Sequence, residues 1–315
     1  IFFSPHNPKR LYAAGNALFV TENEGASWEQ ISPDLTTNDK NKQRSSGGPI
    51  TQDNTSVEYY CTIFTATESA LEKDLLWSGS DDGLVFISKD GGKNWANVTP
   101  PAAPKWMMWN AIETHPSKKG VAYITGTRYK LDDFTPYIYK TTDYGKTWTM
   151  ITNGIAPMHF TRVMRADQKR DSLLYAGTEY GMYISYDDGA NWRSFQLNLP
   201  LVPITDLTIK ENDLVVATQG RAFWVLDDLT VVQQYDPAIA GKKLHVFPIN
   251  AVWRIPGDAS GSFKPSLPVN AGANPIAGAV VNYYIKTPDT LTISIYDSAR
   301  QLIKTFATSD KENPL

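Results

Sequence analysis

The sequence predicts an all-β protein: a β-propeller made of repeated hairpins, followed by the start of a second β-domain. Three observations lead to this fold class. An eight-residue turn pattern recurs four times, at spacings close to the length of a propeller blade. Aromatic residues, which favour strands, make up 12% of the 315 residues. The repeat stops near Tyr235, and strands with a different pattern follow.

The repeated pattern, which we call the box turn, is Ser/Thr-x-Asp-x-Gly-x-x-Trp. Its copies lie at residues 21–28, 88–95, 141–148 and 185–192. The Asp side chain can satisfy the backbone of its own turn, the Gly accepts a positive φ, and the Trp can fold back onto the hairpin. We therefore assign a structural role to the third and last residues of each copy, where the first copy has Asn for Asp: Asn23, Trp28, Asp90, Trp95, Asp143, Trp148, Asp187 and Trp192.

The spacing of the box turns indicates the number and the bounds of the blades. Successive box tryptophans are 67, 53 and 44 residues apart, at or above the length of a four-stranded blade. The excess is expected in loops at 36–56 and 128–136, where binding or catalysis commonly resides. We expect a seven-bladed ring that an upstream chain or a partner must complete, since this chain supplies about five blades, the first of them incomplete: 1–35, 57–100, 106–153, 158–200 and 203–235.

The remainder of the chain predicts a second domain. After a propeller at 1–235, a Pro/Gly/Ser-rich stretch predicts an extended linker at 236–278. Two alternating strands then indicate the start of an immunoglobulin-like β-sandwich at 279–315. The first residue is not Met and the chain stops abruptly, so we expect it to be a piece of a larger multidomain protein.

Composition narrows the function classes. The chain has 30 Lys and Arg against 33 Asp and Glu, scattered along its length, so nucleic acid is not an expected partner. No apolar stretch has the length of a membrane span. Cys61 is the single cysteine, and the four histidines show no metal-ligand spacing. The plentiful acidic turns leave calcium open, but they do not have the spacing of a calcium-binding EF-hand loop. We expect no metal and no cofactor.

These residues resemble the sortilin-like, Asp-box (bacterial neuraminidase repeat) proteins that bacteria secrete, which are often labelled glycosyl hydrolases of sialidase or xyloglucanase-like type. The resemblance rests on the box turns and on residues 77–84, 132–137 and 218–228. It implies a secreted, cell-surface or periplasmic bacterial protein with propellers followed by an immunoglobulin-like domain. Relatives usually have a His before the Gly-Arg pair, where this chain has Gln219.

Carboxylates outside the box turns are the catalytic candidates. Hydrolysis of a glycosidic bond needs two carboxyl groups flanking it. Asp81 and Asp82 lie in the turn of blade two that corresponds to the turn of Glu179 in blade four, so these three residues are candidates. Ordinary solvated turns use the same residue types, and we favour that interpretation. A sialidase also needs an arginine cluster with a Tyr and a Glu, a combination that we do not find.

Four residues are binding candidates. Trp106 and Trp109 belong to a cluster of aromatic and Met residues that can stack on sugar rings or anchor a polypeptide. A first strand packed into the core would have the same pattern, and we favour that alternative. Arg128 and Arg221 can bind an acidic partner, but surface salt bridges or bonds to neighbouring carbonyls explain such arginines, and we favour that structural interpretation.

The function that we favour is an extracellular or cell-envelope binding module that engages a glycan or a polypeptide, rather than an enzyme. The alternative is a xyloglucanase-like tandem-propeller glycoside hydrolase that uses paired Asp carboxylates. A third interpretation, a scaffold within a surface assembly, predicts an exposed flat apolar patch of interface size.

Overall fold

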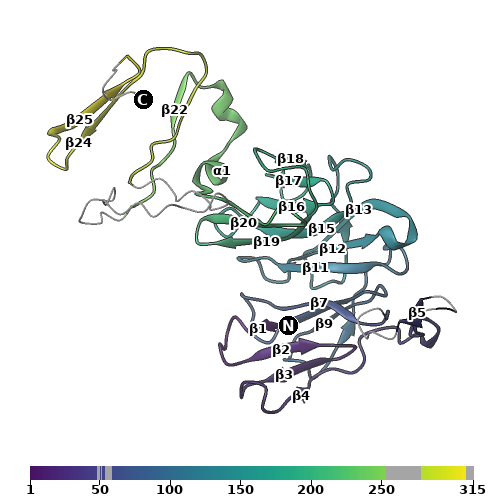
Figure 1. Ribbon diagram of the computed structural model, residues 1–315. Coiled ribbons are helices and arrows are strands. Elements are labelled where there is room, and N and C mark those ends of the chain that lie inside the picture. Colours follow the sequence, from purple (N-terminus) through teal and green to yellow (C-terminus); the bar gives the residue numbers. More distant parts are fainter. Residues whose placement is uncertain (48–49, 51, 54–58, 253–277, 310–315) are drawn as a thin grey trace. The chain divides into compact units, whose positions relative to one another are not determined.

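The computed structural model describes residues 1–47, 50, 52–53, 59–252 and 278–309. The chain forms two compact units, Ile1–Leu226 and Asp227–Leu315, and each is described by itself. Strands dominate both units, as the sequence predicts (Figure 1). Within the described ranges, no helix has the length and apolar character needed to cross a membrane.

The first unit contains five antiparallel sheets whose strands are paired in chain order, four with four strands and the last with three. Blade one has β1 (Phe2–Phe3), β2 (Leu11–Ala14), β3 (Leu18–Thr21) and β4 (Glu29–Gln30). Blade two has β7 (Ile63–Glu68), β8 (Leu76–Ser80), β9 (Val85–Ser88) and β10 (Ala96–Asn97). Blade three has β11 (Met108–Thr114), β12 (Ala122–Arg128), β13 (Asp133–Thr141) and β14 (Thr149–Met150).

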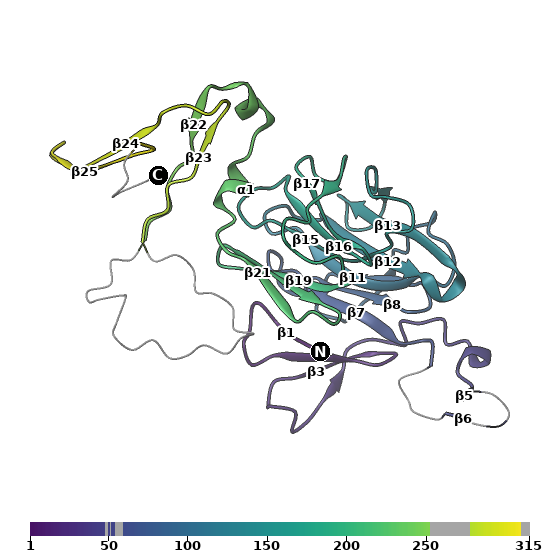
Figure 2. The same cartoon turned by 45° about the horizontal axis from the view of Figure 1, so that its top comes forward.

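Blade four has β15 (Thr161–Ala166), β16 (Leu174–Thr178), β17 (Gly181–Ser185) and β18 (Arg193–Ser194). Blade five has β19 (Ile204–Lys210), β20 (Asp213–Thr218) and β21 (Phe223–Leu226). The blades contact one another through their first strands, β7 with β11, β11 with β15, and β15 with β19. Figure 2 shows β7 and β11 of neighbouring blades side by side. The predicted partial propeller of five blades is confirmed. The first blade, which we expected to be incomplete, has all four strands, and the fifth blade has three.

Two loops carry short elements of their own. The loop between blades one and two contains η1 (Lys40–Lys42), β5 (Ser46–Gly47) and β6 (Gln52–Asp53). The loop before β13 contains η3 (Tyr129–Leu131), which ends at Asp132 in the left-handed conformation. These are the loops in which the sequence placed the excess length of the repeats.

Each box turn is closed by its own side chains. In the second copy, Ser88 Oγ donates to Asp90 Oδ1 (2.9 Å) and accepts from the backbone N–H of Gly92 (2.9 Å). Asp90 also accepts from the backbone N–H of Asn94 (2.9 Å). Gly92 has a φ of +98°, and a Cβ there would lie 2.6 Å from the carbonyl oxygen of Ile31 in blade one. Only glycine fits such a position.

The box tryptophans join each blade to the blade before it. Three indole Nε1 atoms donate to backbone carbonyls of the preceding blade: Trp95 to Ile31 (3.0 Å), Trp148 to Val98 (2.7 Å) and Trp192 to Ile151 (2.6 Å). We call each such contact a blade joint. Trp28, in the first blade, is 43% exposed. The box turn is therefore a device that fixes one blade against its neighbour.

The core lies between adjacent blades. One buried cluster combines Trp77 of β8 with Trp109 of β11 and Ile124 of β12. Glycine at position 79 makes room for this packing, because a Cβ there would lie 2.7 Å from the Cβ of Trp109. A second cluster joins blades three and four through residues such as Met164.

The second unit has α1 (Thr230–Gln234), η4 (Pro237–Gly241) and two antiparallel strand pairs. β22 (Leu244–Val246) pairs with β23 (Tyr283–Ile285), and β24 (Thr292–Tyr296) pairs with β25 (Leu302–Ala307). The segment predicted as an extended linker, 236–278, thus contains η4 and β22. Asp236 begins η4 by accepting from the backbone N–H of Ala238 (2.8 Å). Residues 253–277 lie outside the described ranges, and the β-sandwich stays a prediction.

Candidate functional site

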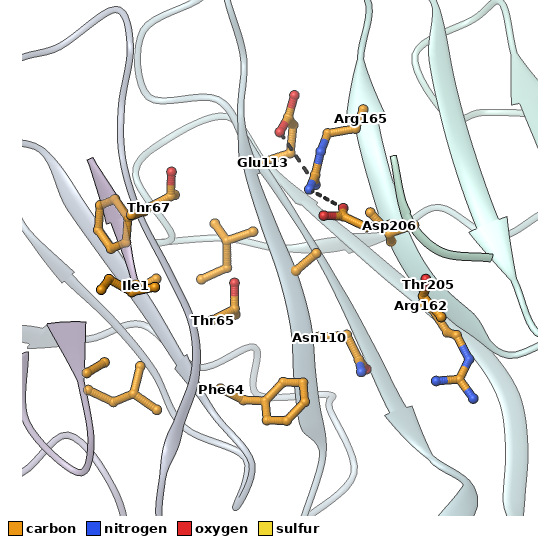
Figure 3. Close-up of a pocket in the computed structure, with 17 residues that line it drawn as sticks. Ile1, Phe64, Thr65, Thr67, Asn110, Glu113, Arg162, Arg165, Thr205 and Asp206 are labelled. Atoms are coloured by element: carbon orange, nitrogen blue, oxygen red, sulfur yellow. Dashed lines mark hydrogen bonds and ion pairs between the residues drawn. The ribbon is translucent and has the colours of Figure 1, made fainter. Parts of the chain in front are cut away.

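The first strands of the five blades line a common cavity of about 540 Å³, which we call the central channel (Figure 3). Its walls come from β1, β7, β11, β15 and β19. The last four of these are also strands through which blades two to five contact one another. Side chains on alternate positions of these strands therefore face either the core or the channel.

A β-bulge recurs at the same place in four of these strands. The pairing register shifts near the start of β7, β11, β15 and β19. A bulge leaves one extra residue without a cross-strand partner and redirects its side chain. The four extra residues all line the central channel and form what we call the bulge tier: Phe64, Asn110, Arg162 and Thr205 (Figure 3).

The bulge tier has four different chemistries. Phe64 is 53% exposed, although it is large and apolar. The Oδ1 atom of Asn110 is buried and has no hydrogen-bond partner among the described residues. Arg162 Nη2 lies 2.6 Å from Glu179 Oε2. Thr205 Oγ1 donates to a backbone carbonyl at 3.2 Å. One level of the channel thus offers an apolar ring, an amide, a guanidinium and a hydroxyl.

Three further side chains, Glu113, Arg165 and Asp206, form a second level that we call the charged tier. Arg165 Nη2 lies 2.7 Å from Asp206 Oδ1, and its Nη1 lies 3.8 Å from Glu113 Oε2 (Figure 3). Burial raises the pKa of Glu113 to about 7, against the opposing effects of Arg165 and of the Ala166 backbone N–H, which donates to Glu113 Oε1 at 3.2 Å. At neutral pH this tier therefore has one carboxyl that readily holds a proton beside an ion pair.

Sequence reasoning missed Glu113 and Asp206. Each is an acidic residue within an otherwise mainly apolar or uncharged first strand. A signal was available for Glu113, because it follows Asn110 by three residues, the spacing that separates Arg165 from Arg162. Asp206 directly follows Thr205 and has no such counterpart. Aligning the first strands of the blades therefore finds Glu113 but not Asp206.

The predicted catalytic carboxylates lie in closed turns outside the channel lining. Asp82 is 4% exposed, and its Oδ2 accepts from both the backbone N–H and the hydroxyl of Thr37 (2.7 Å each). Asp81 Oδ1 accepts from the backbone N–H of Thr62 (2.9 Å), and burial raises the pKa of Asp81. Glu179 pairs with Arg162. Asp81 and Asp82 thus bond to other segments of the chain, and Asp82 is buried, whereas the turn interpretation expected solvated carboxylates.

The predicted binding residues separate into two groups. Trp109 is 0% exposed and belongs to the core, the alternative that we favoured. Arg128 Nη1 pairs with Asp133 Oδ2 (2.6 Å). Arg221 is exposed, and its Nη1 donates to the carbonyl of Gly220 (3.2 Å). Trp106, unlike Trp109, is only partly buried.

Trp106 belongs to a partly exposed group that we call the aromatic ledge, made of Tyr60, Trp106 and Tyr129, which line one small hollow. Tyr129 rests on the ring of Phe160, which is buried (4% exposed). Tyr60 and Trp106 meet edge to face with centroids 5.6 Å apart, and Tyr129 stacks on Phe160 at 5.4 Å. Lys130 Nζ lies 5.8 Å from the Tyr60 centroid, and Arg162 lies 5.3 Å from that of Phe160. Such distances are those of cation–π contacts.

Two features of the ledge are typical of ligand-binding sites. Trp106 has a φ of +60°, and backbone strain of this kind is frequent at functional sites. Arg162 belongs both to the bulge tier and to the cations over the ledge, so the ledge adjoins the channel. Within the described ranges, no three His, Cys, Asp or Glu side chains gather closely enough to hold a metal ion.

Comparison with known proteins identifies a fold and no family. No protein-family model matches the chain, and no curated protein matches it. The chain is similar to a GH74 xyloglucanase from Xanthomonas campestris, with a TM-score of 0.54 and 15% identity, over 72% of this chain and 36% of that one. It is also similar to an ancestral GH74 enzyme, with a TM-score of 0.50 and 14% identity, over 68% and 26%.

At such identities these likenesses show the fold alone, and the chain spans little more than a third of the xyloglucanase. The class of protein is a partial β-propeller.

Proposed function

We propose that this chain is a propeller module that binds a glycan where the aromatic ledge meets the central channel. The observation that carries the proposal is the position of Arg162, which lines the polar channel and lies 5.7 Å from the ring of Tyr129 in the ledge. Aromatic faces suit the apolar face of a sugar ring, and carboxyl, amide and guanidinium groups suit its hydroxyls. A polypeptide is the other ligand that such a surface can take.

The cellular location of this module and the completion of its ring are also proposals. We propose an extracellular or cell-envelope protein of the sortilin-like, Asp-box type, in which upstream chain or a partner completes the ring. The resemblance of the box turns supports this, and a ring of more than five blades is consistent with the exposure of Trp28, whose counterparts Trp95, Trp148 and Trp192 each contact a preceding blade.

The test is binding of the chain to an array of soluble neutral and acidic polysaccharides, with a peptide library beside it. We expect glycan binding that falls about tenfold in Trp106→Ala, the effect of losing one stacking contact. Trp28→Ala is the matched control, since Trp28 is a partly exposed tryptophan outside the ledge. Binding of peptides alone, or equal losses in both variants, would overturn the proposal.

A second candidate, glycoside hydrolysis, is favoured by a specific feature of the charged tier. A glycosidase needs a protonated carboxyl beside a second carboxyl, and Glu113, with a pKa of about 7, lies across Arg165 from Asp206. The assay is release of reducing ends from the polysaccharides that bind. If the chain is an enzyme, Glu113→Gln and Asp206→Asn each abolish release and weaken binding only in part; binding without release in the wild type supports the module.

A further inference from the structure

We infer that the central channel recognises the free end of a neutral glycan chain, with the terminal sugar ring against Phe64 in the bulge tier. This inference rests on the glycan binding proposed above and names its ligand class. Four observations carry it: the varied chemistry of the bulge tier, the exposure of Phe64, the charge balance of the channel, and the order of the levels along the strands.

The bulges repeat in geometry and differ in side chain. A bulge places constraints on the backbone, and four blades satisfy them with Phe64, Asn110, Arg162 and Thr205. If the position served the fold alone, one residue type would serve all four blades, as glycine and tryptophan do at their positions in the box turns. Bulges are over-represented beside active sites, where they direct side chains. The mixed set indicates a ligand with several kinds of surface.

Phe64 supplies the apolar surface of the set. More than half of its side chain is exposed in a channel whose other bulge residues are polar. Figure 3 shows its ring on the side of the channel toward Asn110 and Arg162. A sugar ring has an apolar face bordered by hydroxyls, so Phe64 can stack on that face while polar groups surround its edge. The unpaired amide oxygen of Asn110 is a polar group that the fold itself does not satisfy.

Charge balance favours a neutral sugar. Arg162 is paired with Glu179, and Arg165 with Asp206. The third carboxyl, Glu113, holds its proton below a pH of about 7, because burial raises its pKa. The two guanidinium groups of the channel are therefore each matched by a carboxylate. An anionic sugar would have to displace one of these carboxylates, whereas hydroxyls can bond to both members of each pair.

The order of the levels favours binding by the chain end. Tyr60 and Trp106 of the ledge precede β7 and β11, and the bulge tier follows within the first three residues of each of these strands. Glu113 and Arg165 come three residues later, roughly 7–10 Å further along. A glycan that lies over the ledge reaches the bulge tier with its last ring and the charged tier with the hydroxyls of that ring.

The experiment compares the neutral polysaccharide identified by the array with its own short oligosaccharides, at equal mass, on the full chain. Hydrolysis multiplies chain ends, so the oligosaccharides are expected to compete more strongly per unit mass. Phe64→Ala should weaken oligosaccharide binding about tenfold, and Phe64→Tyr should restore it. Phe223→Ala is the matched control, because Phe223 is exposed on β21, outside the channel.

Two results overturn the inference and leave the proposed function standing. They are wild-type affinity in Phe64→Ala while Trp106→Ala loses binding, and tighter binding of oligosaccharides that end in a uronic or sialic acid than of neutral ones. Failure of the wild type to bind any glycan removes the proposed function and the inference together.

Discussion

The box turns and the bulges of the first strands are both repeated features, and they repeat in different ways. In the box turns the backbone and the side chains recur together, as in Asp90, Asp143 and Asp187. In the bulges the backbone recurs and the side chains do not, as in Phe64 and Arg162. The copies within one chain thus separate residues that the fold requires from residues that the fold leaves free.

The reason lies in what each position contacts. A box turn must satisfy its own backbone in every copy, and in blades two, three and four its tryptophan also bonds to a backbone carbonyl of the preceding blade. A bulged residue has lost its cross-strand partner and faces the channel, so nothing in the sheet dictates its side chain. Substitutions that change either the box turns or the channel-facing residues, and leave the other region intact, test this explanation directly.

The largest expected effect is on a blade joint. Trp192→Ala removes a side chain that is 5% exposed and leaves the carbonyl of Ile151 without its indole donor. We expect a loss of about 3–5 kcal/mol in the free energy of unfolding, measured with urea. Trp28→Ala, at the partly exposed first copy, should cost less than about 1 kcal/mol. Equal losses would show that the box tryptophans do not act through the joints.

The next effect concerns the charged tier and has the opposite sign. The pKa of Glu113 rises from 4.5 to about 7 because burial disfavours its charge, so folding is unaffected below pH 4.5 and loses stability as the pH rises to 7. The loss is on the order of 3 kcal/mol at most. Glu113→Gln should therefore match the wild type in urea at pH 4.5 and exceed it at pH 8. A wild type more stable than the variant at pH 8 would contradict this.

The two regions also differ in how far the sequence alone predicts them. The box turns are local, because eight consecutive residues contain every group that closes the turn, and the blades follow from their spacing. The bulges arise from pairing between strands, so Phe64 does not stand out in the sequence. Asp82 looked like a catalytic candidate because its closing partner, Thr37, lies 45 residues away. Trp109 looked like a binding residue because the glycine that admits it to the core lies on another blade.

The smallest effect that we predict concerns the charge of the box turn rather than its shape. Asp143 accepts from the backbone N–H of Thr147 at 2.9 Å and from its hydroxyl at 2.7 Å. In the first copy Asn23 accepts from the backbone N–H of Ser27 at 3.0 Å and donates to the Ser27 hydroxyl at 2.8 Å. An amide therefore closes the same turn once the hydroxyl reverses its role, and Asp143→Asn should change the melting temperature at pH 7 by no more than about 2 °C.

The contribution of the Asp143 carboxylate charge should be measurable at acidic pH. Hydrogen bonds, first from the Thr147 hydroxyl and then from its backbone N–H, lower the pKa of Asp143 to about 2 from an ordinary 3.8. Its contribution to stability is present above pH 3.8 and is lost as the pH falls through 2. Melting temperatures between pH 7 and 2 should thus fall less steeply for Asp143→Asn than for the wild type. Asp143→Ala lacks any acceptor and should melt lower at every pH; if Asp143→Asn melts equally low at pH 7, the carboxylate charge holds the turn and the amide of Asn23 is not its equivalent.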